Sequence, residues 1–340
     1  MANRPDLSVI VLTYNGRAWL DTCLRAVIEG IDRHRLAAEV ILVDNASNDG
    51  TAEFVKGTFP SVRVLSLARN AGFTGGNNAG ARIADGSLLA FLNNDTRVSS
   101  GWLHALANAF VAPDIGLATS RIVFLDRPDT IDSAGDGYTR AGGAFKRHHG
   151  GSASDPVATT AGEVFGACGA AFMIRRDLFD RLGGFDQDFF MVYEDVDLSY
   201  RARLAGFRCV YVPDAVVEHA GSATLGAQSD ASVFHGQRNL EWAYVKNTPG
   251  GLLLRSFLSH VLYDIAGAAY FLRQGRFHAF ARGKLAALIG LPRMLAKRRA
   301  IQRNRRVSAA QLLSVMDRNW IDIKRREKQT IAARASSVPR

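Results

Sequence analysis

The chain has 340 residues, with 42 lysines and arginines against 32 aspartates and glutamates, which gives a formal charge of +10 and an isoelectric point near 9.8. A composition of 47% hydrophobic and 22% charged residues excludes collagen-like, low-complexity and wholly disordered chains. The length exceeds what one core usually fills, so we expect one large domain with an appendage, or two domains. The three cysteines lie far apart without a CxxC pair, which argues against disulfides and thiolate zinc.

The charge is distributed unevenly along the chain. Residues 1–230 carry 21 basic and 27 acidic side chains, a net charge of −6, whereas residues 231–340 carry 21 basic and 5 acidic side chains, a net charge of +16. We therefore expect two parts with different partners: a domain over 1–230 and a basic, helical region over 231–340. The apolar run near the start, Leu7 to Leu12, is too short for a signal peptide, so we expect the protein to be cytoplasmic.

The first hundred residues alternate short β-branched runs with helix-like stretches, which is the spacing of βαβ units. The predicted strands cover 8–13, 40–44, 62–67 and 88–92, and the predicted helices cover 18–31, 51–57, 74–84 and 101–110. This pattern indicates an α/β fold with a mainly parallel, doubly wound sheet covered on both faces. Ligands of such sheets lie beyond the carboxyl ends of the strands, and that is where the polar residues of this chain collect.

The middle of the chain shows a weaker pattern. Residues 126–162 are rich in Gly, Asp, Ser and Thr without a sustained period, so we interpret them as a long loop and a candidate lid. After this loop, the predicted elements are a strand over 164–174, helices over 176–182 and 195–205, and a strand over 208–212 that Pro213 ends.

Beyond Ser222 the chain changes to apolar helical stretches, 252–272 and 277–295, punctuated by arginines. These stretches contain too many ionisable groups to span a bilayer comfortably. With the basic residues that follow, they favour helices lying on an anionic membrane surface, and we expect residues 235–306 to dock there. The alternative is a solvated basic helical pair that packs on the first domain or mediates dimerisation.

Asp95 follows a predicted buried strand directly, in the segment Asn93-Asn94-Asp95. A buried carboxylate costs desolvation energy unless it is partnered, and a divalent cation that bridges to phosphate oxygens is a suitable partner. The alternative is a simple turn, which these residue types often form.

Two further polar segments precede helices. Asp44 closes the second strand, where a nucleobase or ribose would need an acceptor, although the residues after it also suit a plain helix cap. The stretch 69–78, RNAGFTGGNN, has glycines that allow close backbone approach, and the amides of a helix start favour phosphate oxygens. It is neither GxGxxG nor a Walker loop, so a dinucleotide cofactor or an ATPase is not supported.

Three carboxylates follow an aromatic run at 189–197, FFMVYEDVD. The helix dipole explains any one of them, but a carboxylate beside apolar surface is also how a general base has its pKa raised. His219 follows the last predicted strand, and it is either a structural histidine or, with an Asp oxygen, a ligand suited to Mn²⁺ or Mg²⁺.

Several of these motifs, taken in order, closely resemble the family 2 glycosyltransferases of GT-A fold, and above all their bacterial rhamnosyltransferase-like branch. The resemblance covers about residues 7–222. The segments that carry it are SVIVLTYNG, VILVDNASNDGT, RNAGFTGGNNAG, LLAFLNND, GACGAAFMIRRDLFDRLGGFDQDFFMVYEDVDLSYRARLAGF and VVEHAGS.

The resemblance implies a role for individual residues. Asp195, in the pair with Glu194, matches the catalytic base. Asp95 matches the last acid of the family's DxD metal motif, whose first acid is replaced here by Asn93, and His219 matches a second metal ligand for Mn²⁺ or Mg²⁺. The residues that match the nucleotide-sugar site are Thr13, Tyr14, Asn15, Asp44, Asn70, Gly76, Asn77, Asn94 and Asp95.

The activity implied is inverting transfer of a sugar from a nucleotide-diphosphate sugar, with dTDP-rhamnose as the first expectation. The expected acceptor is a glycan or a polyprenyl-diphosphate-linked sugar in bacterial cell-surface polysaccharide synthesis, reached from the inner face of the cell membrane. The alternatives are a GT-A-like nucleotidyltransferase, a non-catalytic nucleotide-sugar-binding protein and a nucleic-acid-binding protein. A nucleotidyltransferase would need a Gly-rich basic loop, which is missing near 8–25. A nucleic-acid-binding protein would leave the carboxylates without a role, so we expect no nucleic-acid partner. The sequence leaves the oligomeric state open.

Overall fold

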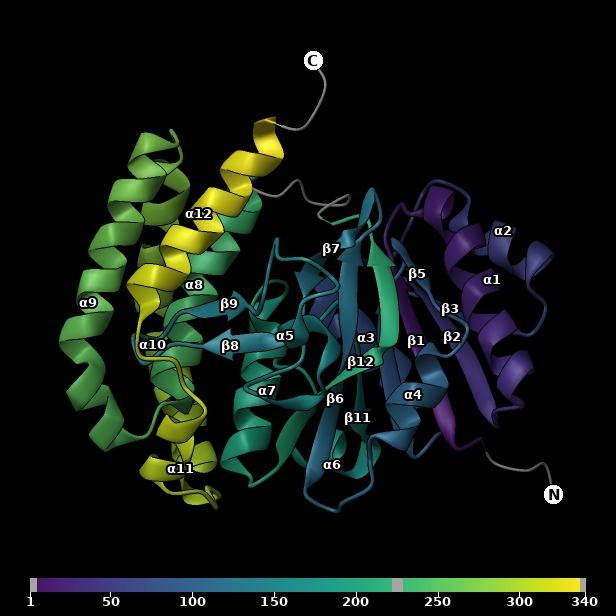
Figure 1. The fold of residues 1–340 in the computed structure, drawn as a ribbon, viewed down its shortest axis with the longest axis horizontal. Helices are drawn as coiled ribbons and strands as arrows, with labels where there is room; N and C mark the ends of the chain where they lie inside the picture. Colours follow the sequence, from purple (N-terminus) through teal and green to yellow (C-terminus); the bar gives the residue numbers. More distant parts are fainter. Residues whose placement is uncertain (1–4, 222–228, 337–340) are drawn as a thin grey trace.

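The structure is a computed structural model that describes residues 5–221 and 229–336. A sheet with its covering helices forms one side of the molecule, and long helices from the C-terminal part of the chain form the other (Figure 1). The first elements are β1 (Leu7–Thr13), α1 (Arg17–His34), β2 (Ala38–Asp44), α2 (Thr51–Thr58), β3 (Val62–Ser66), α3 (Gly72–Ile83), β4 (Leu88–Asn93) and α4 (Trp102–Asn108). The four strands are parallel neighbours in the order β4-β1-β2-β3, so the βαβ prediction for this part is confirmed.

The sheet continues beyond β4 through strands that are mostly antiparallel to it. These later elements are β5 (Thr96–Val98), β6 (Ile115–Phe124), β7 (Arg127–Ser133), β10 (Gly162–Val164), β11 (Ala171–Arg175), α6 (Arg176–Arg181), α7 (Glu194–Leu204) and β12 (Arg208–His219). In the described residues the order is β10-β12-β6-β11-β4-β1-β2-β3, with β5 paired to β12 and β7 paired to β6. Because β11 runs antiparallel to both β4 and β6, the sheet is mixed.

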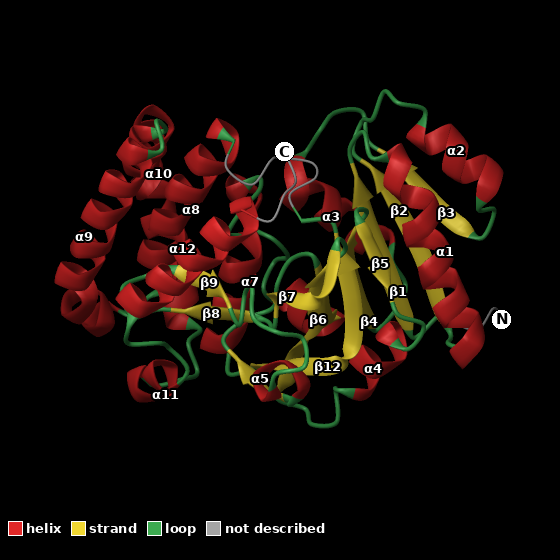
Figure 2. Ribbon diagram, turned by 45° about the horizontal axis from the view of Figure 1, so that its top comes forward, coloured by secondary structure: helices red, strands yellow, loops and turns green. Residues whose placement is uncertain are grey.

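Helices cover both faces of the sheet (Figure 2). Side chains of α1, α2 and α4, such as Leu20 and Leu106, are buried in one core. On the opposite face, α3, α6 and α7 contribute Ala81, Leu178 and Leu198. A parallel strand buried on both faces needs apolar side chains at successive positions, and Val9, Ile10 and Val11 meet that need.

The prediction that residues 126–162 form a structureless loop is wrong. β7 extends the main sheet, β8 (Asp136–Tyr138) and β9 (Ala144–Lys146) form a two-stranded sheet of their own, and α5 (Pro156–Thr159) follows. These strands are short and rich in Asp, Gly and Thr, so the sequence shows no clear alternation of apolar and polar residues there. The single strand predicted over 164–174 is also wrong, because β10 and β11 are separate strands.

Pro213 does not end the last strand, contrary to the prediction. β12 runs on to His219, and its register against β6 shifts between Val212 and Val216. This irregularity accommodates the proline, which has no N–H to donate to a ladder. The strand therefore delivers Glu218 and His219 to the edge of the sheet. Ser222, the end of the last motif, lies outside the described residues.

The C-terminal part consists of α8 (Asp230–Asn247), α9 (Gly250–Arg273), α10 (Phe277–Arg303), α11 (Ala309–Ser314) and α12 (Trp320–Ser336). The helices predicted over 252–272 and 277–295 correspond to α9 and α10, whereas α8 was missed. Trp242 of α8 donates a hydrogen bond to the carbonyl of Ala287 on α10, and Gly290 leaves room for its ring. Across the described residues, none of the helices is both long enough and apolar enough to cross a bilayer.

Buried ion pairs attach these helices to α7 and to the turn that precedes it, on the sheet side of the molecule. Lys246 of α8 is 1% exposed and lies 2.6 Å from Asp186 and 2.7 Å from Asp197. Lys297 of α10 also bonds Asp186. A buried charge is tolerated only when it is paired and hydrogen-bonded, so the helices and the sheet stabilise each other.

Candidate active site

The carboxyl ends of β1 and β2 form the first part of the site. Thr13 and Asp44 are direct neighbours in the register of these strands, and both are buried. Asp44 accepts a hydrogen bond from the backbone N–H of Ser47, and Asn15 accepts one from the N–H of Asn48, each within 3.0 Å. The loops after both strands are therefore tied together, and the predicted residues Thr13, Asn15 and Asp44 share one edge. Tyr14 lies there too, with 41% of its surface exposed.

The stretch at the start of α3 contributes unequally to this edge. The side-chain oxygen of Asn70 accepts a hydrogen bond from Asn45, the residue after β2, at 2.9 Å. Gly76 instead faces β1, because a Cβ at this position would lie 2.3 Å from a methyl of Leu12. Asn77 is 1% exposed and donates to the carbonyl of Phe73 in its own helix. Asn70 thus lies at the edge, whereas Gly76 and Asn77 pack within the fold.

The segment after β4 brings Asn94 and Asp95 to the same edge. Asn94 donates a 3.0 Å hydrogen bond to the hydroxyl of Thr13. β5 pairs with β12, which places Asp95 beside His219, with Asp95 Oδ1 and His219 Nε2 3.4 Å apart. The two side chains are almost fully buried. The structure therefore joins the two residues that the resemblance had linked through a metal.

Asp132 of β7 fixes the orientation of His219, and the sequence analysis missed it. Its carboxylate lies 2.9 Å from His219 Nδ1, which leaves Nε2 facing Asp95. Burial lowers the pKa of His219, but the hydrogen bonds with Asp132 and Asp95 outweigh it and raise this pKa to about 9. A carboxylate that orients a histidine in this way is typical of metal sites, and an imidazole nitrogen beside a carboxylate oxygen suits Mn²⁺ or Mg²⁺. The residues present fit a divalent cation.

Lys146 of β9 extends this series of polar contacts, and the sequence analysis missed it as well. Its ammonium lies 2.7 Å from Asp132, on the carboxylate oxygen that does not face His219. Burial would raise the pKa of Asp132, but the charge of Lys146 and the hydrogen bond with His219 hold it well below its usual range. Asp95, His219, Asp132 and Lys146 thus form one connected series.

Asp195 lies at the start of α7 and lines a cavity of about 230 Å³ together with Asp136 and Lys146. Its two oxygens accept hydrogen bonds from the backbone N–H groups of Gly169 and Val196, both at 2.7 Å. Burial raises the pKa of Asp195, although these backbone bonds oppose the shift. A carboxylate held in one orientation at a cavity, with a raised pKa, has the properties of a general base.

Two more carboxylates border the same cavity. Glu194 and Asp136 are both buried, and each has one oxygen without a hydrogen-bond partner among the described residues. Burial, reinforced by the charge of Asp195, raises the pKa of both well above the usual range. Asp136 belongs to the stretch interpreted as a loop, so no period in the sequence could have revealed it.

The backbone before α7 adopts an unusual conformation. Phe190, Val192 and Tyr193 have φ angles of 62°, 65° and 74°, in the left-handed region that costs about 1–3 kcal/mol for each such residue. Asn239 of α8 compensates, because its amide nitrogen lies 2.6–2.9 Å from the carbonyl oxygens of residues 189, 191 and 192. A C-terminal helix therefore holds the segment that leads into Asp195.

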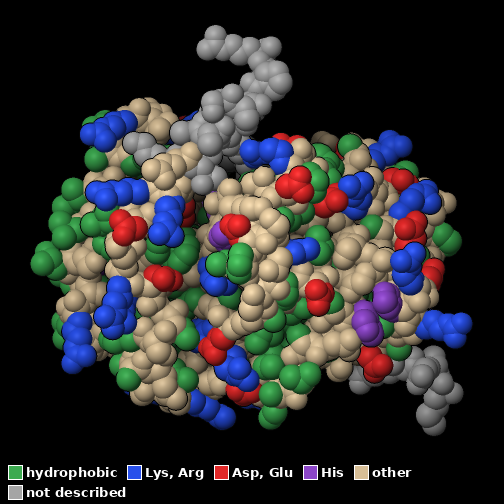
Figure 3. All heavy atoms as spheres, viewed as in Figure 1, with side chains coloured by type: hydrophobic (Ala, Val, Ile, Leu, Met, Phe, Trp, Pro, Cys, Tyr) green, Lys and Arg blue, Asp and Glu red, His purple; other side chains and the backbone are tan. Residues whose placement is uncertain are grey.

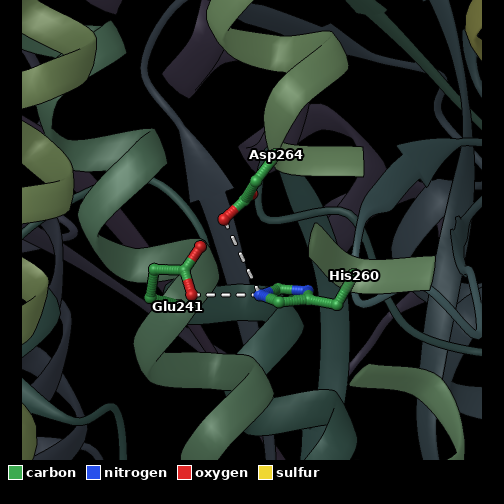
Figure 4. A group of neighbouring side chains, drawn as sticks. All are labelled: Glu241, His260 and Asp264. Carbon is green, nitrogen blue, oxygen red and sulfur yellow. Dashed lines mark hydrogen bonds and ion pairs between the residues drawn. The ribbon is translucent and has the colours of Figure 1, made fainter. Parts of the chain in front are cut away.

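Glu241 of α8 forms a separate group with His260 and Asp264 of α9 (Figure 4). The oxygen and nitrogen atoms with which these side chains could bind a metal lie within 4.8 Å of one another. Lys284 of α10 bonds both carboxylates, at 2.7 Å from Asp264. The ammonium thus supplies the positive charge that a metal ion would bring. This group is a charge network between helices.

Solved structures of known proteins share this fold. The crystal structure titled GalNAc-T7 with UDP, GalNAc and Mn²⁺ matches with a TM-score of 0.58 and 20% identity, over 72% of this chain and 48% of that one. A mannosyltransferase from Pyrobaculum calidifontis in complex with GDP-Man and Mn²⁺ matches with a TM-score of 0.53 and 21% identity, over 92% of this chain and 79% of that one. The architecture is the GT-A fold, with a helical extension at the C-terminus.

Within this fold, the amino-acid sequence identifies the family. The family model described as glycosyl transferase family 2 matches residues 8–183, and the chain belongs to this family of glycosyltransferases. An N-acetylglucosaminyl-diphospho-decaprenol L-rhamnosyltransferase of Mycobacterium tuberculosis is 27% identical over 65% of this chain and 78% of its own length. The O-antigen biosynthesis protein RfbC of Myxococcus xanthus is 31% identical over 56% of this chain, which spans 16% of that protein.

Proposed function

We propose that the protein transfers a sugar, rhamnose in the first instance, from a nucleotide-diphosphate donor to a glycan or polyprenyl-diphosphate-linked acceptor, with inversion, in bacterial cell-surface polysaccharide synthesis. Residues 1–230 would form the transferase domain, and residues 231–340 the membrane-associating region. The observation that carries the proposal is that the edge with Asp44, Asp95 and His219 connects through Asp132 and Lys146 to the cavity of Asp195. The relative that is a rhamnosyltransferase supports the choice of sugar and acceptor.

The donor nucleotide would bind along the edge formed by β1, β2 and β4. Asp44 offers a buried carboxylate at the end of β2, with Thr13, Asn15 and Asn70 around it. Tyr14 has the exposed ring that a base can stack on.

Asp95 and His219 would hold Mn²⁺ or Mg²⁺, with Asp132 orienting the imidazole. The bound cation supplies positive charge against the diphosphate leaving group. Of the DxD pattern this chain has only the last acid, and His219 is the second donor residue beside it.

Asp195 would accept the proton of the acceptor hydroxyl as that oxygen attacks the anomeric carbon. The N–H groups of Gly169 and Val196 fix the carboxylate, and the absence of a side chain at Gly169 leaves room for it, since a Cβ there would lie 2.9 Å from Asp195 Oδ2. Glu194 and Asp136 are buried beside this carboxylate, and burial together with the charge of Asp195 raises the pKa of both carboxyl groups. Since the acceptor supplies the nucleophile, no Ser or Cys nucleophile is required.

The test of the transferase proposal is a thermal unfolding series of the full chain with nucleoside diphosphates and nucleotide sugars, each with and without Mn²⁺. A ligand that binds the folded state raises the melting temperature, so we expect a metal-dependent rise with one nucleotide. A nucleotide that binds without any sugar transfer to lipid-linked acceptors would favour the non-catalytic alternative. Release of pyrophosphate from a nucleoside triphosphate and a sugar phosphate would favour the nucleotidyltransferase.

We further propose peripheral association with the inner face of the cell membrane, through the outer face of α9 and α10. Of the fifteen exposed large hydrophobic side chains in the described residues, eleven lie on these two helices, and Figure 3 shows hydrophobic and basic side chains side by side at the edge where α9 lies. Residues 250–303 contain ten lysines and arginines and one acidic residue, Asp264. Two such faces would repel each other in a symmetric dimer, whereas an anionic bilayer attracts them.

Vesicle flotation tests this association with point variants, because removing the helices would also remove Lys246 and Lys297 from Asp186 and Lys246 from Asp197. Leu258 and Ile289 are 70% and 74% exposed, and Leu258→Glu with Ile289→Glu should abolish binding to phosphatidylglycerol vesicles. Val111→Glu, at a site 85% exposed on the sheet side, is the matched control. Equal flotation of the wild type, the double variant and Val111→Glu would contradict the membrane proposal. If the wild type formed a concentration-dependent dimer and the double variant did not, dimerisation would be favoured instead.

A further inference from the structure

A second cavity lies between the turn that joins β8 to β9 and the helices α9 and α11. It has a volume of about 350 Å³, and its lining includes Tyr138, Arg140, Arg255 and Arg318. The described residues that line it include three arginines and no acidic side chain. We propose that this cavity binds a phosphate or diphosphate group.

Segments far apart in the chain build the cavity. After α11 the chain returns alongside β8, where the N–H of Asp317 donates to the carbonyl of Tyr138 and the N–H of Arg140 donates to the carbonyl of Asp317, both at 2.9 Å. This pairing fixes Arg318 beside Arg140. Arg255 enters from the early turns of α9. The positive groups are thus placed by backbone hydrogen bonds and a helix.

Polar atoms of the cavity lack partners in the part of the chain that the structure describes. Tyr138 is 1% exposed, and its buried hydroxyl makes no hydrogen bond. Arg140 donates to the carbonyl of Leu313, but its buried Nε has no acceptor. A buried polar group without a partner costs free energy, so both atoms favour a bound acceptor.

The charges point to the same kind of ligand. Arg140 and Arg318 both line the cavity, and burial together with the charge of Arg318 lowers the pKa of Arg140. Arginine is the side chain best suited to phosphate, because its planar group donates two parallel hydrogen bonds. The hydroxyls of Ser256 and Ser259 add donors on the α9 side.

An apolar chain attached to the phosphate would also fit. Leu252, Leu313 and Met316 line the cavity, and Leu254 and Leu258, on the turns of α9 around Arg255, are exposed. The shared chemistry is a phosphate group, which either a lipid headgroup or a free phosphate compound can supply. This inference goes beyond the transfer reaction, because binding here requires neither the donor nor Asp195.

The first arm of the test is calorimetric titration of the full chain with inorganic pyrophosphate. Arg140→Gln and Arg318→Gln should each weaken binding about tenfold, because each removes a charge-assisted donor pair. Tyr138→Phe should weaken binding several-fold without lowering the melting temperature of the free protein, since the hydroxyl has no protein partner. Arg82→Gln, at an exposed arginine of α3, is the matched control. If pyrophosphate bound at the nucleotide edge instead, its affinity would not change in these variants. An unchanged affinity in Arg140→Gln and Arg318→Gln therefore overturns the proposal.

The second arm compares flotation with phosphatidylcholine vesicles that contain phosphatidic acid, a phosphomonoester, or an equal charge of phosphatidylglycerol, a phosphodiester. A preference for phosphatidic acid that disappears in Arg140→Gln and Arg318→Gln supports a lipid headgroup as the ligand. Sensitivity of pyrophosphate binding without such a preference supports a free phosphate compound. Absence of both pyrophosphate binding and vesicle preference overturns the proposal, whether or not the protein transfers sugar.

Discussion

The cavity of Asp195 and the contact between the C-terminal helices contain buried carboxylates with opposite pKa shifts. Around the cavity of Asp195, Glu194 and Asp136 each keep an oxygen without a partner, and their pKa values are raised. Among the helices, Glu241 is bonded by His260 and Lys284, and its pKa falls to about 2. A carboxylate left unpaired at a cavity can accept a proton, whereas a paired one stabilises the fold. The contrast separates the residues proposed for chemistry from those that hold the structure.

The two regions nevertheless depend on each other. Lys246 forms ion pairs with Asp186 and Asp197 on the sheet side, and Asn239 holds the strained segment before α7. The helices therefore act as a structural support for the site as well as a proposed membrane contact. The following changes test where one role ends and the other begins.

The largest effect is expected from Asp195→Asn, which removes the proton acceptor. Transfer should fall at least 10²–10⁴-fold, roughly the contribution of general base catalysis, while nucleotide affinity changes little. Initial rates and nucleotide titrations measure the two quantities. Asp126→Asn, at a carboxylate that is 68% exposed, should match the wild type. Undiminished transfer by Asp195→Asn would remove the assignment of the base.

Lys246→Met should destabilise the protein by about 1–3 kcal/mol, because each of two buried carboxylates loses a charge-assisted hydrogen bond while Asp197 keeps Arg201 and Asp186 keeps Lys297. Urea unfolding measures this loss, with Lys56→Met at an exposed lysine as the control. If both variants lost the same small amount of stability, the helices would not be fastened to the sheet by these charges.

Asn239→Ala removes the donors to the carbonyls before α7 and should cost about 1–3 kcal/mol of stability. Because the segment leads into Asp195, we expect kcat to fall more than the donor's KM changes. Steady-state kinetics at saturating metal provide the readout. A loss of stability with unchanged kcat would show that the segment keeps its geometry without α8.

The smallest effect concerns Glu241 and acid. Burial raises its pKa, but the hydrogen bond with His260 and the charge of Lys284 lower it to about 2. A carboxyl whose pKa is lower in the folded state stabilises the fold above its unfolded value of about 4.3, and this stability is lost as the pH falls towards 2. Urea unfolding between about pH 5 and pH 2.5 should show a shallower decline for Glu241→Gln than for the wild type. Parallel declines would contradict this account.

The sequence was informative where one physical signal dominated. Continuous apolar runs predicted β1 to β4, and the polar residues after them predicted the edge at which Asp44 and Asp95 lie. Both signals are local, since parallel strands buried on two faces need apolar residues at every position. The pairing of Asp95 with His219 came from the family resemblance, and the register of β5 with β12 brings the two side chains together.

The remaining features depend on contacts between distant segments. Asp132, Asp136 and Lys146 lie on short polar strands, and their place is set by pairing with β6 and with each other. Pro213 was predicted to end the last strand because proline has no N–H to donate, but a register shift of β12 against β6 accommodates it. Likewise, no pattern around Asn239 indicates that its amide meets carbonyls 47 to 50 residues away.

The dependence of Asp195 on α8 also sets an order of events during synthesis. A ribosome completes the sheet strands and the segment before α7 well before it adds Asn239, which lies 48 residues after Met191. Until α8 has emerged, nothing compensates the left-handed backbone at Phe190, Val192 and Tyr193. The carbonyl groups before the proposed base therefore gain their hydrogen-bond donor only after α8 has been made, so the site is completed in the same stretch of synthesis that produces the helices proposed to contact the membrane.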